Sequence, residues 1–497
     1  MPYITILPNN QTLFAENGDL LLDVLAKYGL SISAPCGGKG SCGKCKVKLI
    51  SGAVDGVTAD EKGDILACKA RIKSDITLRL SPQAGTGLND FSWESIQGDK
   101  DGFGVVLDIG TTTLALCLIH LSTGKVIEKI SALNPQAVYG ADVLSRIQAC
   151  NEGKLPELQK CILQKTDELI QKIAGGKEIE ELIVCANTTM LHIFLGVHPQ
   201  SIGVAPFIPV FTEMQICTGK ELNLPVRKVK LLPSASAYIG SDITAGAYAC
   251  GMHETEKTVL LVDIGTNGEI VLSHKGKLYA SSTSAGPALE GACIERGIGG
   301  VSGAVDKMYT NGVELCVSTI DNEKAIGICG SGLIDAIALL SKENLIDETG
   351  AFVDDSDSRF SSHLLGDKFY LTDTVWLSQK DIRQVQLAKS AILAGIETLL
   401  EENGITIGEV DELLLAGGLA YYMNIENACV IGLLPKTLQA KTRVVGNTAL
   451  AGARLCVLQE NACKKLQTLA KEMQIFELAN SKTFQERYIE NMYFPQE

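Results

Sequence analysis

Two similar stretches, FGVVLDIGTTTLALCLI at residues 103–119 and VLLVDIGTNGEIVLS at residues 259–273, decide the fold of most of this chain. Each consists of an apolar run, a tight turn that begins with Asp-Ile-Gly-Thr, and a second apolar run, a pattern that predicts two strands joined by a turn. A single turn of this kind is weak evidence, because glycine turns join strands for steric reasons alone. Two matched copies indicate an internal duplication. We therefore predict a two-lobed domain with one turn from each lobe facing a shared cleft.

The residue types in both turns suit phosphate binding. Glycine permits close approach of the backbone, and threonine hydroxyls and backbone N–H groups can hold phosphate oxygens. An aspartate at the end of the strand can hold a hydrated magnesium ion or orient water. We therefore predict that Asp108 and Asp263 are catalytic residues that face each other across a nucleotide.

A third motif, LLLAGGLA at residues 413–420, is an apolar strand that leads into a double-glycine turn. Alone it favours a role in helix packing, but after two phosphate turns it indicates a surface for adenine or ribose. The set resembles the acetate and sugar kinase, Hsp70 and actin superfamily, whose ribonuclease H-like lobes enclose ATP. That resemblance implies connecting helices in residues 236–249 and 446–455, where small residues would permit a close crossing at a hinge.

The N-terminal part contains a cysteine cluster, APCGGKGSCGKC at residues 34–45, followed by Cys68. Such clusters usually bind zinc or iron. One close pair shares a loop with a third cysteine and the fourth is isolated, an asymmetry that favours a 2Fe–2S cluster and leaves zinc as the alternative. The glycines of the loop would let its backbone wrap a cluster and point N–H groups at the sulfurs.

The flanking segments agree with a small β-grasp domain. YITIL and QTLFAE predict a hairpin, LLDVLAKYG a short helix, and KVKLISG and ITLRL further strands. The cysteine spacing resembles that of adrenodoxin-type 2Fe–2S ferredoxins. The stretch from Ser81 to Gly102 is rich in Gly, Ser and Asp, which is typical of a linker.

The chain is therefore expected to be an α+β multidomain protein, a β-grasp ferredoxin domain followed by a two-lobed ATPase of the actin, Hsp70 and sugar-kinase type. We expect the ferredoxin domain at residues 1–82, a flexible linker at 83–102, lobe I at 103–257, lobe II at 258–460 and a C-terminal helical tail at 461–497.

Composition excludes several classes of partner. The 497-residue chain has a formal net charge of −14 and no long basic run, so nucleic acid is not expected as a partner. No stretch approaches the roughly 20 apolar residues of a membrane span, and the N-terminus does not read as a secretory leader, so we expect a cytoplasmic protein without a membrane partner. The 16 cysteines are expected to be thiols rather than a disulfide framework.

The fusion of a ferredoxin domain to this ATPase resembles the reductive activators of corrinoid proteins. The likeness extends over nearly the whole chain: CGGKGSCGKC, ANTTMLH (186–192), SAGPALEG (284–291), GICGSGLID (327–335), AGGLA and the terminal segment 484–495. Such activators use ATP to return an inactive cob(II)amide cofactor to cob(I)amide by one-electron reduction. The resemblance implies two partners, a corrinoid protein in its cob(II)amide form and a low-potential electron donor.

The same resemblance assigns site residues and implies a 2Fe–2S cluster, ATP and Mg²⁺. The cluster ligands would be Cys36, Cys42, Cys45 and Cys68. The nucleotide would contact Gly110, Thr111 and Thr112 in the first turn, Gly265, Thr266 and Asn267 in the second, Gly417 and Gly418 in the nucleoside turn, and the Gly330, Ser331, Gly332 triplet.

One departure from the longer activators is expected. The linker leads directly to the first phosphate turn, so the sequence predicts a compact member without a separate middle domain. The linker would let the ferredoxin domain swing between an electron donor and the corrinoid.

Other functions stay open at this stage. A redox-regulated small-molecule kinase, an ATP-binding switch that does not hydrolyse ATP, and an ATP-driven electron donor to another low-potential metalloenzyme would all use these domains. An activator of 2-hydroxyacyl-CoA dehydratases is disfavoured, because those proteins use a 4Fe–4S cluster at a dimer interface and lack a ferredoxin domain. The sequence leaves open whether the protein forms a homodimer.

Overall fold

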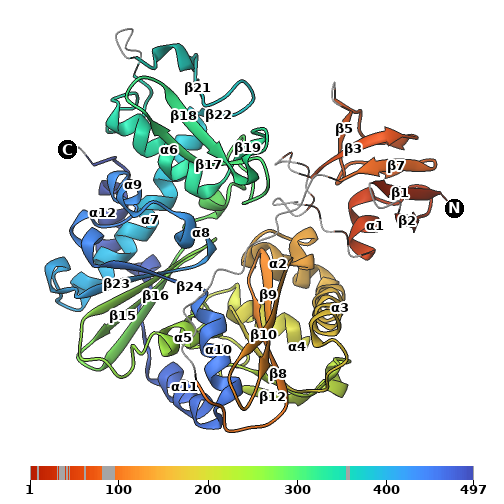
Figure 1. The fold of residues 1–497 in the computed structure, drawn as a ribbon, viewed down its shortest axis with the longest axis vertical. Coiled ribbons are helices and arrows are strands. Elements are labelled where there is room, and N and C mark those ends of the chain that lie inside the picture. Colours follow the sequence, from red (N-terminus) through yellow and green to blue (C-terminus); the bar gives the residue numbers. More distant parts are fainter. Residues whose placement is uncertain are drawn as a thin grey trace.

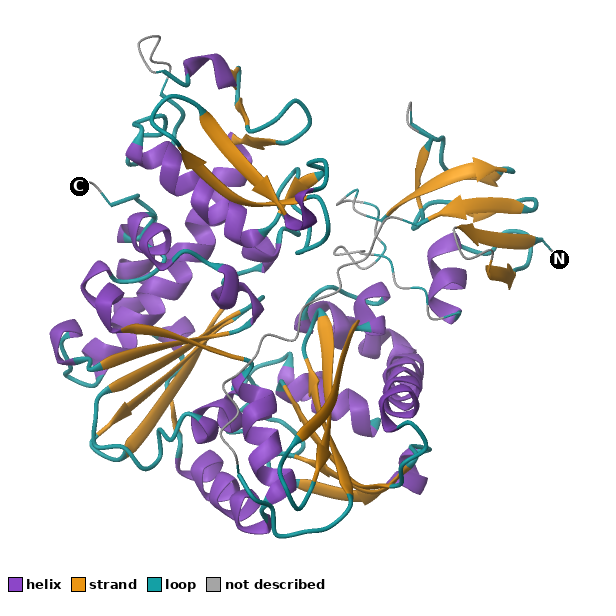
Figure 2. Ribbon diagram, in the orientation of Figure 1, coloured by secondary structure: helices purple, strands orange, loops and turns teal. Residues whose placement is uncertain are grey.

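The computed structural model describes residues 2–7, 11–28, 30, 32, 38, 40, 43, 45–60, 63–80, 96–353 and 359–495. They form a small N-terminal domain and two larger lobes, each lobe containing a sheet with helices on its faces (Figures 1 and 2). Among the described helices, none combines the length and the apolar character needed to cross a membrane.

The N-terminal domain is a five-stranded sheet with one helix, in the strand order β2-β1-β7-β3-β5. β1 is antiparallel to β2 and parallel to β7. This arrangement confirms the predicted hairpin, helix and further strands of a β-grasp domain. Its elements are β1 (Tyr3–Leu7), β2 (Gln11–Phe14), α1 (Leu21–Lys27), β3 (Lys46–Ser51), β5 (Asp64–Leu66) and β7 (Ile76–Arg79), with a small ribbon of β4 (Val54–Asp55) and β6 (Arg71–Ile72).

Lobe I contains a six-stranded sheet in the order β10-β9-β8-β11-β13-β12. The first three strands in sequence form an antiparallel meander, and β11 and β13 then run parallel to β8. The strands are β8 (Phe103–Ile109), β9 (Thr113–His120), β10 (Val126–Leu133), β11 (Ile179–Ala186), β12 (Gln215–Thr218) and β13 (Val226–Leu231). The helices are α2 (Val143–Ala149), α3 (Leu155–Ala174), α4 (Thr188–Leu195) and α5 (Ser241–Ala249).

Lobe II repeats this plan in the order β24-β23-β14-β15-β16-β25. Again an antiparallel meander is followed by two strands parallel to its first strand, which confirms the predicted duplication. The strands are β14 (Val259–Ile264), β15 (Gly268–His274), β16 (Lys277–Thr283), β23 (Glu412–Ala416), β24 (Thr442–Gly446) and β25 (Gln474–Ile475).

In its described residues, lobe II also contains four further helices and two small sheets, and the small sheets lie at the top of Figure 1. The helices are α6 (Gly330–Lys342), α7 (Gln379–Glu402), α8 (Gly418–Tyr422) and α9 (Ile425–Val430). The small sheets comprise β17 (Ala304–Thr310), β18 (Leu315–Thr319) and β19 (Gly327–Ile328), and then β20 (Leu364–Leu365), β21 (Lys368–Tyr370) and β22 (Trp376–Ser378).

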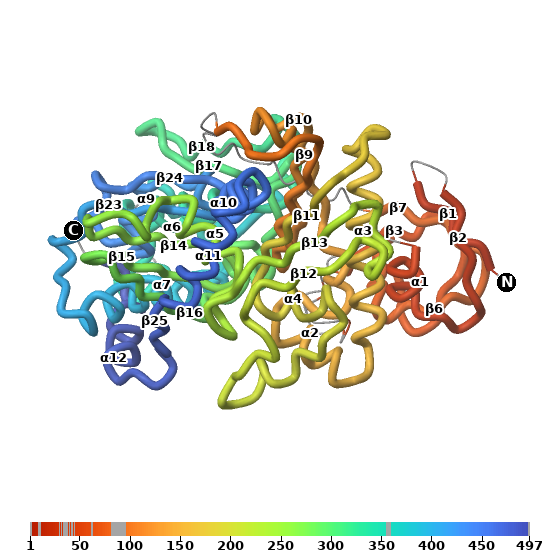
Figure 3. Tube along the Cα trace, turned by 90° about the horizontal axis from the view of Figure 1, so that it is seen from below, coloured from red at the N-terminus to blue at the C-terminus, as the bar shows by residue number. Residues whose placement is uncertain are grey.

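Two helices, α5 and α10 (Thr448–Leu458), lie between the two large sheets (Figure 3). One apolar core contains side chains from both sheets and both helices. The helices cross closely, because a Cβ on Gly452 would lie 2.2 Å from the carbonyl oxygen of Ala245, and one on Gly246 would lie 2.6 Å from Thr448 Oγ1. The expected crossing of small-residue helices is therefore present, and it joins the lobes.

The C-terminal residues form the expected helices, and they touch both lobes. In α11 (Glu460–Glu472), Gln467 Oε1 accepts a hydrogen bond from Met214 N of lobe I at 2.9 Å. In α12 (Lys482–Glu490), Arg487 pairs with Glu401 of α7 at 3.1 Å. The tail therefore spans from one lobe to the other.

The predicted linker can be compared with the structure only at residues 96–102. Residues 81–95 lie outside the described residues. Residues 96–102 pack on lobe I and α10: Gly98 N donates to Ser122 O at 3.2 Å and Asp99 N donates to Leu458 O at 3.1 Å. The structure therefore differs from the prediction in this last part, because backbone groups there are paired with neighbouring elements.

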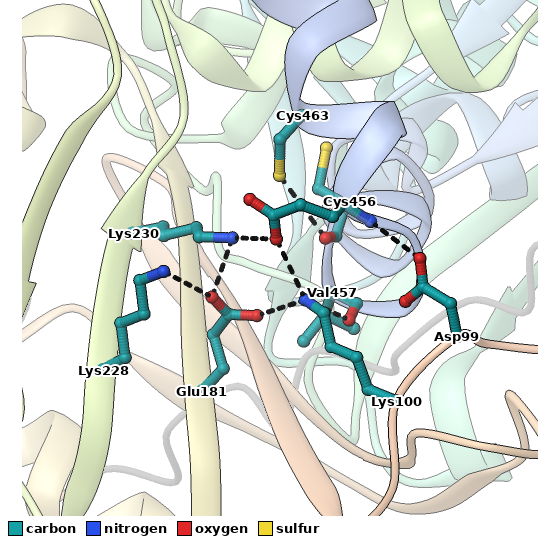
Figure 4. Close-up of polar contacts among 9 residues, drawn as sticks. Asp99, Lys100, Glu181, Lys228, Lys230, Cys456, Val457 and Cys463 are labelled. Carbon is teal, nitrogen blue, oxygen red and sulfur yellow. Dashed lines mark hydrogen bonds and ion pairs between the residues drawn. The ribbon is translucent and has the colours of Figure 1, made fainter.

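Charged side chains fix this entry segment (Figure 4). Lys100 Nζ lies 2.9 Å from Glu181 Oε2 of β11 and 3.3 Å from Glu460 Oε2 of α11. The fully buried Lys230 lies 2.9 Å from Glu181 Oε1 and 2.8 Å from Glu460 Oε2. The network ties the chain entering lobe I to the start of the C-terminal helices.

Candidate functional site

The first predicted phosphate turn joins β8 to β9. It is closed by a hydrogen bond from Gly110 N to Thr113 O at 2.9 Å. Two side chains hold it from behind: Asn134 Nδ2 donates to Gly110 O at 2.8 Å, and the buried guanidinium of Arg146 donates to Thr111 O. Because these carbonyls are engaged inside the lobe, the exposed Thr112 is left on the outer side of the turn.

The second predicted turn joins β14 to β15 and is closed one residue earlier than the first, because Gly265 N donates to Asn267 O at 3.0 Å. Asp263 is the last residue but one of the preceding strand, as Asp108 is in lobe I. The nucleoside turn lies beside it. A Cβ on Gly417, whose φ is +95°, would lie 2.8 Å from Asp263 Oδ1, whereas a Cβ on Gly418 would meet nothing within 4 Å. One glycine thus permits contact with the second turn, and the next leaves bare backbone on which a nucleoside can lie.

A carboxylate joins the two turns. Glu290 Oε2 accepts a hydrogen bond from Thr112 Oγ1 of lobe I at 3.2 Å. Both oxygens of Glu290 lie 3.1 Å from Thr266 Oγ1 of lobe II. The two turns predicted to bind one nucleotide therefore both hydrogen-bond to this side chain.

Three aspartates interact electrostatically where the lobes meet. Burial raises the pKa of Asp108 to about 6, although a hydrogen bond from Asn447 Nδ2 at 2.7 Å opposes this rise. Burial, followed by the charge of Asp108, raises the pKa of Asp263 to about 7. Burial and the charges of Asp108 and Asp263 likewise raise the pKa of Asp242 to about 7. This much negative charge in one place favours a cation or a proton there.

The residues present fit a hydrated magnesium ion better than a directly bound metal. Among the residues that the structure describes, no three His, Cys, Asp or Glu side chains converge in a geometry that could hold a metal ion. Magnesium commonly keeps several waters and uses only one or two carboxylates together with phosphate oxygens. Asp108 and Asp263 suit that mode of binding.

The predicted glycine triplet lies behind the turn that carries Glu290. A Cβ on Gly330 would lie 2.1 Å from Leu289 O, and a Cβ on Gly332 would lie 2.3 Å from Val305 O. Ser331 Oγ donates to Asp306 O at 3.0 Å. The triplet therefore packs the start of α6 closely against both 3-10 helix η5 (Pro287–Glu290) and β17, and its direct contact with a nucleotide stays a prediction.

Two of the four predicted cluster ligands can be placed. Cys45 and Cys68 are buried in the core of the N-terminal domain, while Cys36 and Cys42 lie outside the described residues. The described glycines near these ligands, Gly38, Gly40 and Gly43, are left-handed, with φ of +77°, +73° and +68°. A Cβ on Gly38 would lie 4.0 Å from the Cβ of Cys68. Left-handed glycines close to buried cysteines fit an iron–sulfur cluster.

The N-terminal domain contacts lobe I next to the first phosphate turn. Its helix α1 lies against 3-10 helix η1 (Pro135–Val138), and Val138 packs against the core of the N-terminal domain. The residue that caps η1 is Asn134, which also holds Gly110 of the phosphate turn. The surface that meets the ferredoxin domain is thus directly connected to the predicted nucleotide site.

Sequence reasoning did not identify Glu290, Asp242, Asn447 or Arg146 as parts of this site. Glu290 lies in SAGPALEG and Asp242 in the segment 236–249, which contains α5, but nothing in either stretch marks the acid as special. Asn447 and Arg146 act through contacts with residues far away in the chain. These roles depend on contacts that exist only in the folded chain.

Three known domain families match successive parts of the chain. The 2Fe-2S iron-sulfur cluster binding domain matches residues 4–73, the RACo middle region residues 103–255, and the C-terminal domain of RACo, the ASKHA domain, residues 257–497. The predicted absence of a middle domain is therefore wrong. The middle region, residues 103–255, coincides with lobe I, the lobe that contains the first phosphate turn.

Full-length relatives support the same assignment. The chain is 29% identical to "Corrinoid activation enzyme RamQ" of Eubacterium limosum over 96% of both proteins. It is 25% identical to "[Co(II) methylated amine-specific corrinoid protein] reductase" of Methanosarcina barkeri over 78% of this chain and 76% of that protein. Among solved structures, "Reductive activator for corrinoid,iron-sulfur protein" covers 100% of this chain and 99% of its own, with 26% identity and a TM-score of 0.73.

Proposed function

This chain belongs to the RACo family, and we propose that it reductively activates a corrinoid protein, passing one electron from a 2Fe–2S cluster to cob(II)amide in an ATP-dependent reaction that restores cob(I)amide for methyl transfer. One observation carries the proposal. In a single chain, a cysteine-containing ferredoxin domain contacts a lobe whose phosphate turn is joined, through Glu290, to a second phosphate turn.

ATP is needed because the electron transfer is thermodynamically unfavourable. Each ~59 mV of unfavourable potential difference is a tenfold penalty for a one-electron step. A cluster with an ordinary ferredoxin potential would therefore reduce cob(II)amide only in trace amounts. We infer that the nucleotide state and the corrinoid oxidation state each alter the affinity between the two proteins, so that hydrolysis drives formation and release of their complex.

Cys36, Cys42, Cys45 and Cys68 would hold the cluster, which supplies one electron when reduced. The glycines of residues 37–43 would let backbone N–H groups approach its sulfurs, and such hydrogen bonds tune the reduction potential. The contact between α1 and η1 would hold the ferredoxin domain against the ATPase next to the first phosphate turn.

The turns would bind ATP with separate tasks. Thr111, Thr112, Thr266 and Asn267 would hold phosphate oxygens, and Gly417 and Gly418 would lie against the nucleoside. Asp108, positioned by Asn447, would hold a hydrated Mg²⁺, and Asp263, with its raised pKa, would orient and deprotonate the attacking water. Rotation of the lobes about the α5–α10 crossing would carry the nucleotide state to the surface that meets the corrinoid protein.

The test is an anaerobic reduction. The reduced protein is mixed with a cob(II)amide-bearing corrinoid protein, and the cob(I)amide absorbance band is followed with and without Mg-ATP. We expect the band to grow only with ATP. Cys68→Ser should abolish electron transfer to cob(II)amide and leave ATP hydrolysis intact. Asp263→Ala should abolish ATP-dependent reduction and leave the cluster absorbance intact.

Two results would overturn the proposal. Growth of the band without nucleotide would mean that ATP has another task. No growth with any corrinoid protein tested, despite an intact cluster and measurable hydrolysis, would favour another electron acceptor or a kinase. The identity of the electron donor, a homodimer and the cytoplasmic location remain predictions that this assay does not address.

A further inference from the structure

Glu290 is the side chain that bonds to both phosphate turns, and sequence reasoning gave it no role. Its carboxylate accepts from Thr112 at 3.2 Å and from Thr266 at 3.1 Å, so it spans lobe I and lobe II. Under the proposed function, on which this inference rests, these two hydroxyls are donors to phosphate oxygens. Glu290 therefore contacts the groups that a nucleotide would use.

The carboxylate is presented from a rigid support. The turn η5 that ends at Glu290 lies between Gly286 and Gly291, with φ of +74° and +79°. A Cβ on Gly291 would lie 2.8 Å from Ile298 N, and Ala288 and Leu289 are buried in the core of lobe II. Because the backbone is fixed, the position of the carboxylate between the turns is a property of the fold rather than of a loose surface chain.

A threonine hydroxyl has one proton to donate. It cannot satisfy a carboxylate and a phosphate oxygen with that proton at the same time. Two anions held by the same donors also repel each other. We propose that Glu290 competes with the phosphates of ATP for Thr112 and Thr266, and so acts as a positioning latch that holds the two turns together until nucleotide displaces it.

The surroundings support competition rather than simple packing. Burial raises the pKa of the Glu290 carboxyl even though hydrogen bonds from Thr266 and Thr112 favour its charged form. Its bonds to these threonines are the main compensation for placing that charge between the lobes. Because phosphate must displace Glu290, the latch lowers the apparent affinity for nucleotide. The contact between the two turns then depends on whether Glu290 or phosphate accepts from the threonine hydroxyls.

Equilibrium binding of ADP and a nonhydrolysable ATP analogue to the full chain tests the competition. Glu290→Gln keeps the shape of the side chain and removes its charge, so the side chain would bond more weakly to the two threonines and compete less with phosphate. We therefore expect a dissociation constant for nucleotide about tenfold lower than that of the wild type. Glu295→Gln removes an exposed carboxylate five residues away that pairs with Lys368, and it should leave the constant unchanged.

Hydrogen exchange in protein prepared without nucleotide supplies a readout independent of activity. Glu290→Ala should speed exchange in both turns, residues 110–113 and 265–268, whereas a purely structural role in lobe II would affect only the second. An unchanged or weaker nucleotide affinity in Glu290→Gln, or exchange that changes in one turn alone, would overturn the latch. A wild-type protein that binds no nucleotide would instead overturn the proposed function, and the latch with it.

Discussion

The two lobes share a strand order and an Asp-Ile-Gly-Thr turn, yet they surround the aspartate differently. In lobe I, Asp108 accepts a hydrogen bond from Asn447, and its pKa rises only to about 6. In lobe II, Asp263 packs against Gly417, and burial together with the charge of Asp108 raises its pKa to about 7. The comparison teaches that two turns with the same Asp-Ile-Gly-Thr sequence can place their aspartates in different surroundings, one beside an amide donor and the other beside Gly417.

The lobes also secure their chain ends differently. The segment entering lobe I is held by ion pairs around Lys230, whose pKa is raised because hydrogen bonds to Glu460 and Glu181 outweigh its burial. The C-terminus on lobe II is held by Lys389, which donates to the carbonyl oxygens of Asn491 and Tyr493 at 2.5 and 2.7 Å. Burial lowers the pKa of this lysine to about 7. Acidic partners thus raise the pKa of one buried lysine, whereas burial lowers the pKa of the other.

The largest expected effect separates the two aspartates. Asp263→Asn should lower kcat for ATP hydrolysis at least about a hundredfold, because the amide cannot accept a proton from water. Asp108→Asn should act mainly on KM for Mg-ATP, because Asn447 holds that side chain in place for the ion. Steady-state hydrolysis over a range of Mg²⁺ concentrations distinguishes them, and equal effects on kcat and KM would break the comparison.

The next effect concerns the crossing that unites the lobes. Gly452→Val should lower the free energy of unfolding by roughly 3 kcal/mol, because the new side chain would begin 2.2 Å from the carbonyl oxygen of Ala245. Chemical denaturation followed by circular dichroism measures this. Gly408→Ala is the control, since a Cβ there meets nothing within 4 Å. Separate transitions for the lobes, only one of them shifted, would show that the crossing does not couple them.

The same contrast explains what could be predicted. The strand pairs and both turns were predictable because apolar periodicity and glycine position are local signals, as around Asp108 and Asp263, whereas the connecting helices were implied by the family resemblance. Residues 96–102 resembled a linker because a packed loop and a flexible one share the same polar composition. Glu290 was missed because its role depends on hydrogen bonds from two threonines, one of which belongs to the other lobe. Long-range contacts of this kind leave no pattern in a single sequence.

A smaller effect, in stability against pH, follows from Lys389. Its folded pKa lies below the ordinary value, so between about pH 7 and 10 the unfolded chain binds the extra proton, and stability rises with pH. Each pH unit contributes at most about 1.4 kcal/mol, so we expect a gain of about 2 kcal/mol between about pH 7 and 9. Urea denaturation measures the slope, which Lys389→Met should flatten. An identical slope in that variant would show that other groups cause it.

The smallest effect comes from the entry to lobe I. Lys100 is 27% exposed at its side chain, and without it Glu181 keeps its pair with the buried Lys230, so Lys100→Ala leaves no isolated buried charge. We expect a loss of about 1 kcal/mol that shrinks as salt is added, as measured by denaturation at two ionic strengths. Lys73→Ala removes a fully surface pair with Asp55, 61% and 62% exposed, and should change stability by less than about 0.5 kcal/mol.

A loss in Lys100→Ala as small as that of the control would mean that the backbone bonds of Gly98 and Asp99 hold the segment alone. A loss of several kcal/mol would mean that Lys230 cannot keep Glu181 paired. The ion pairing that distinguishes Lys230 of lobe I from Lys389 of lobe II, which bonds to carbonyl oxygens, would then depend on Lys100.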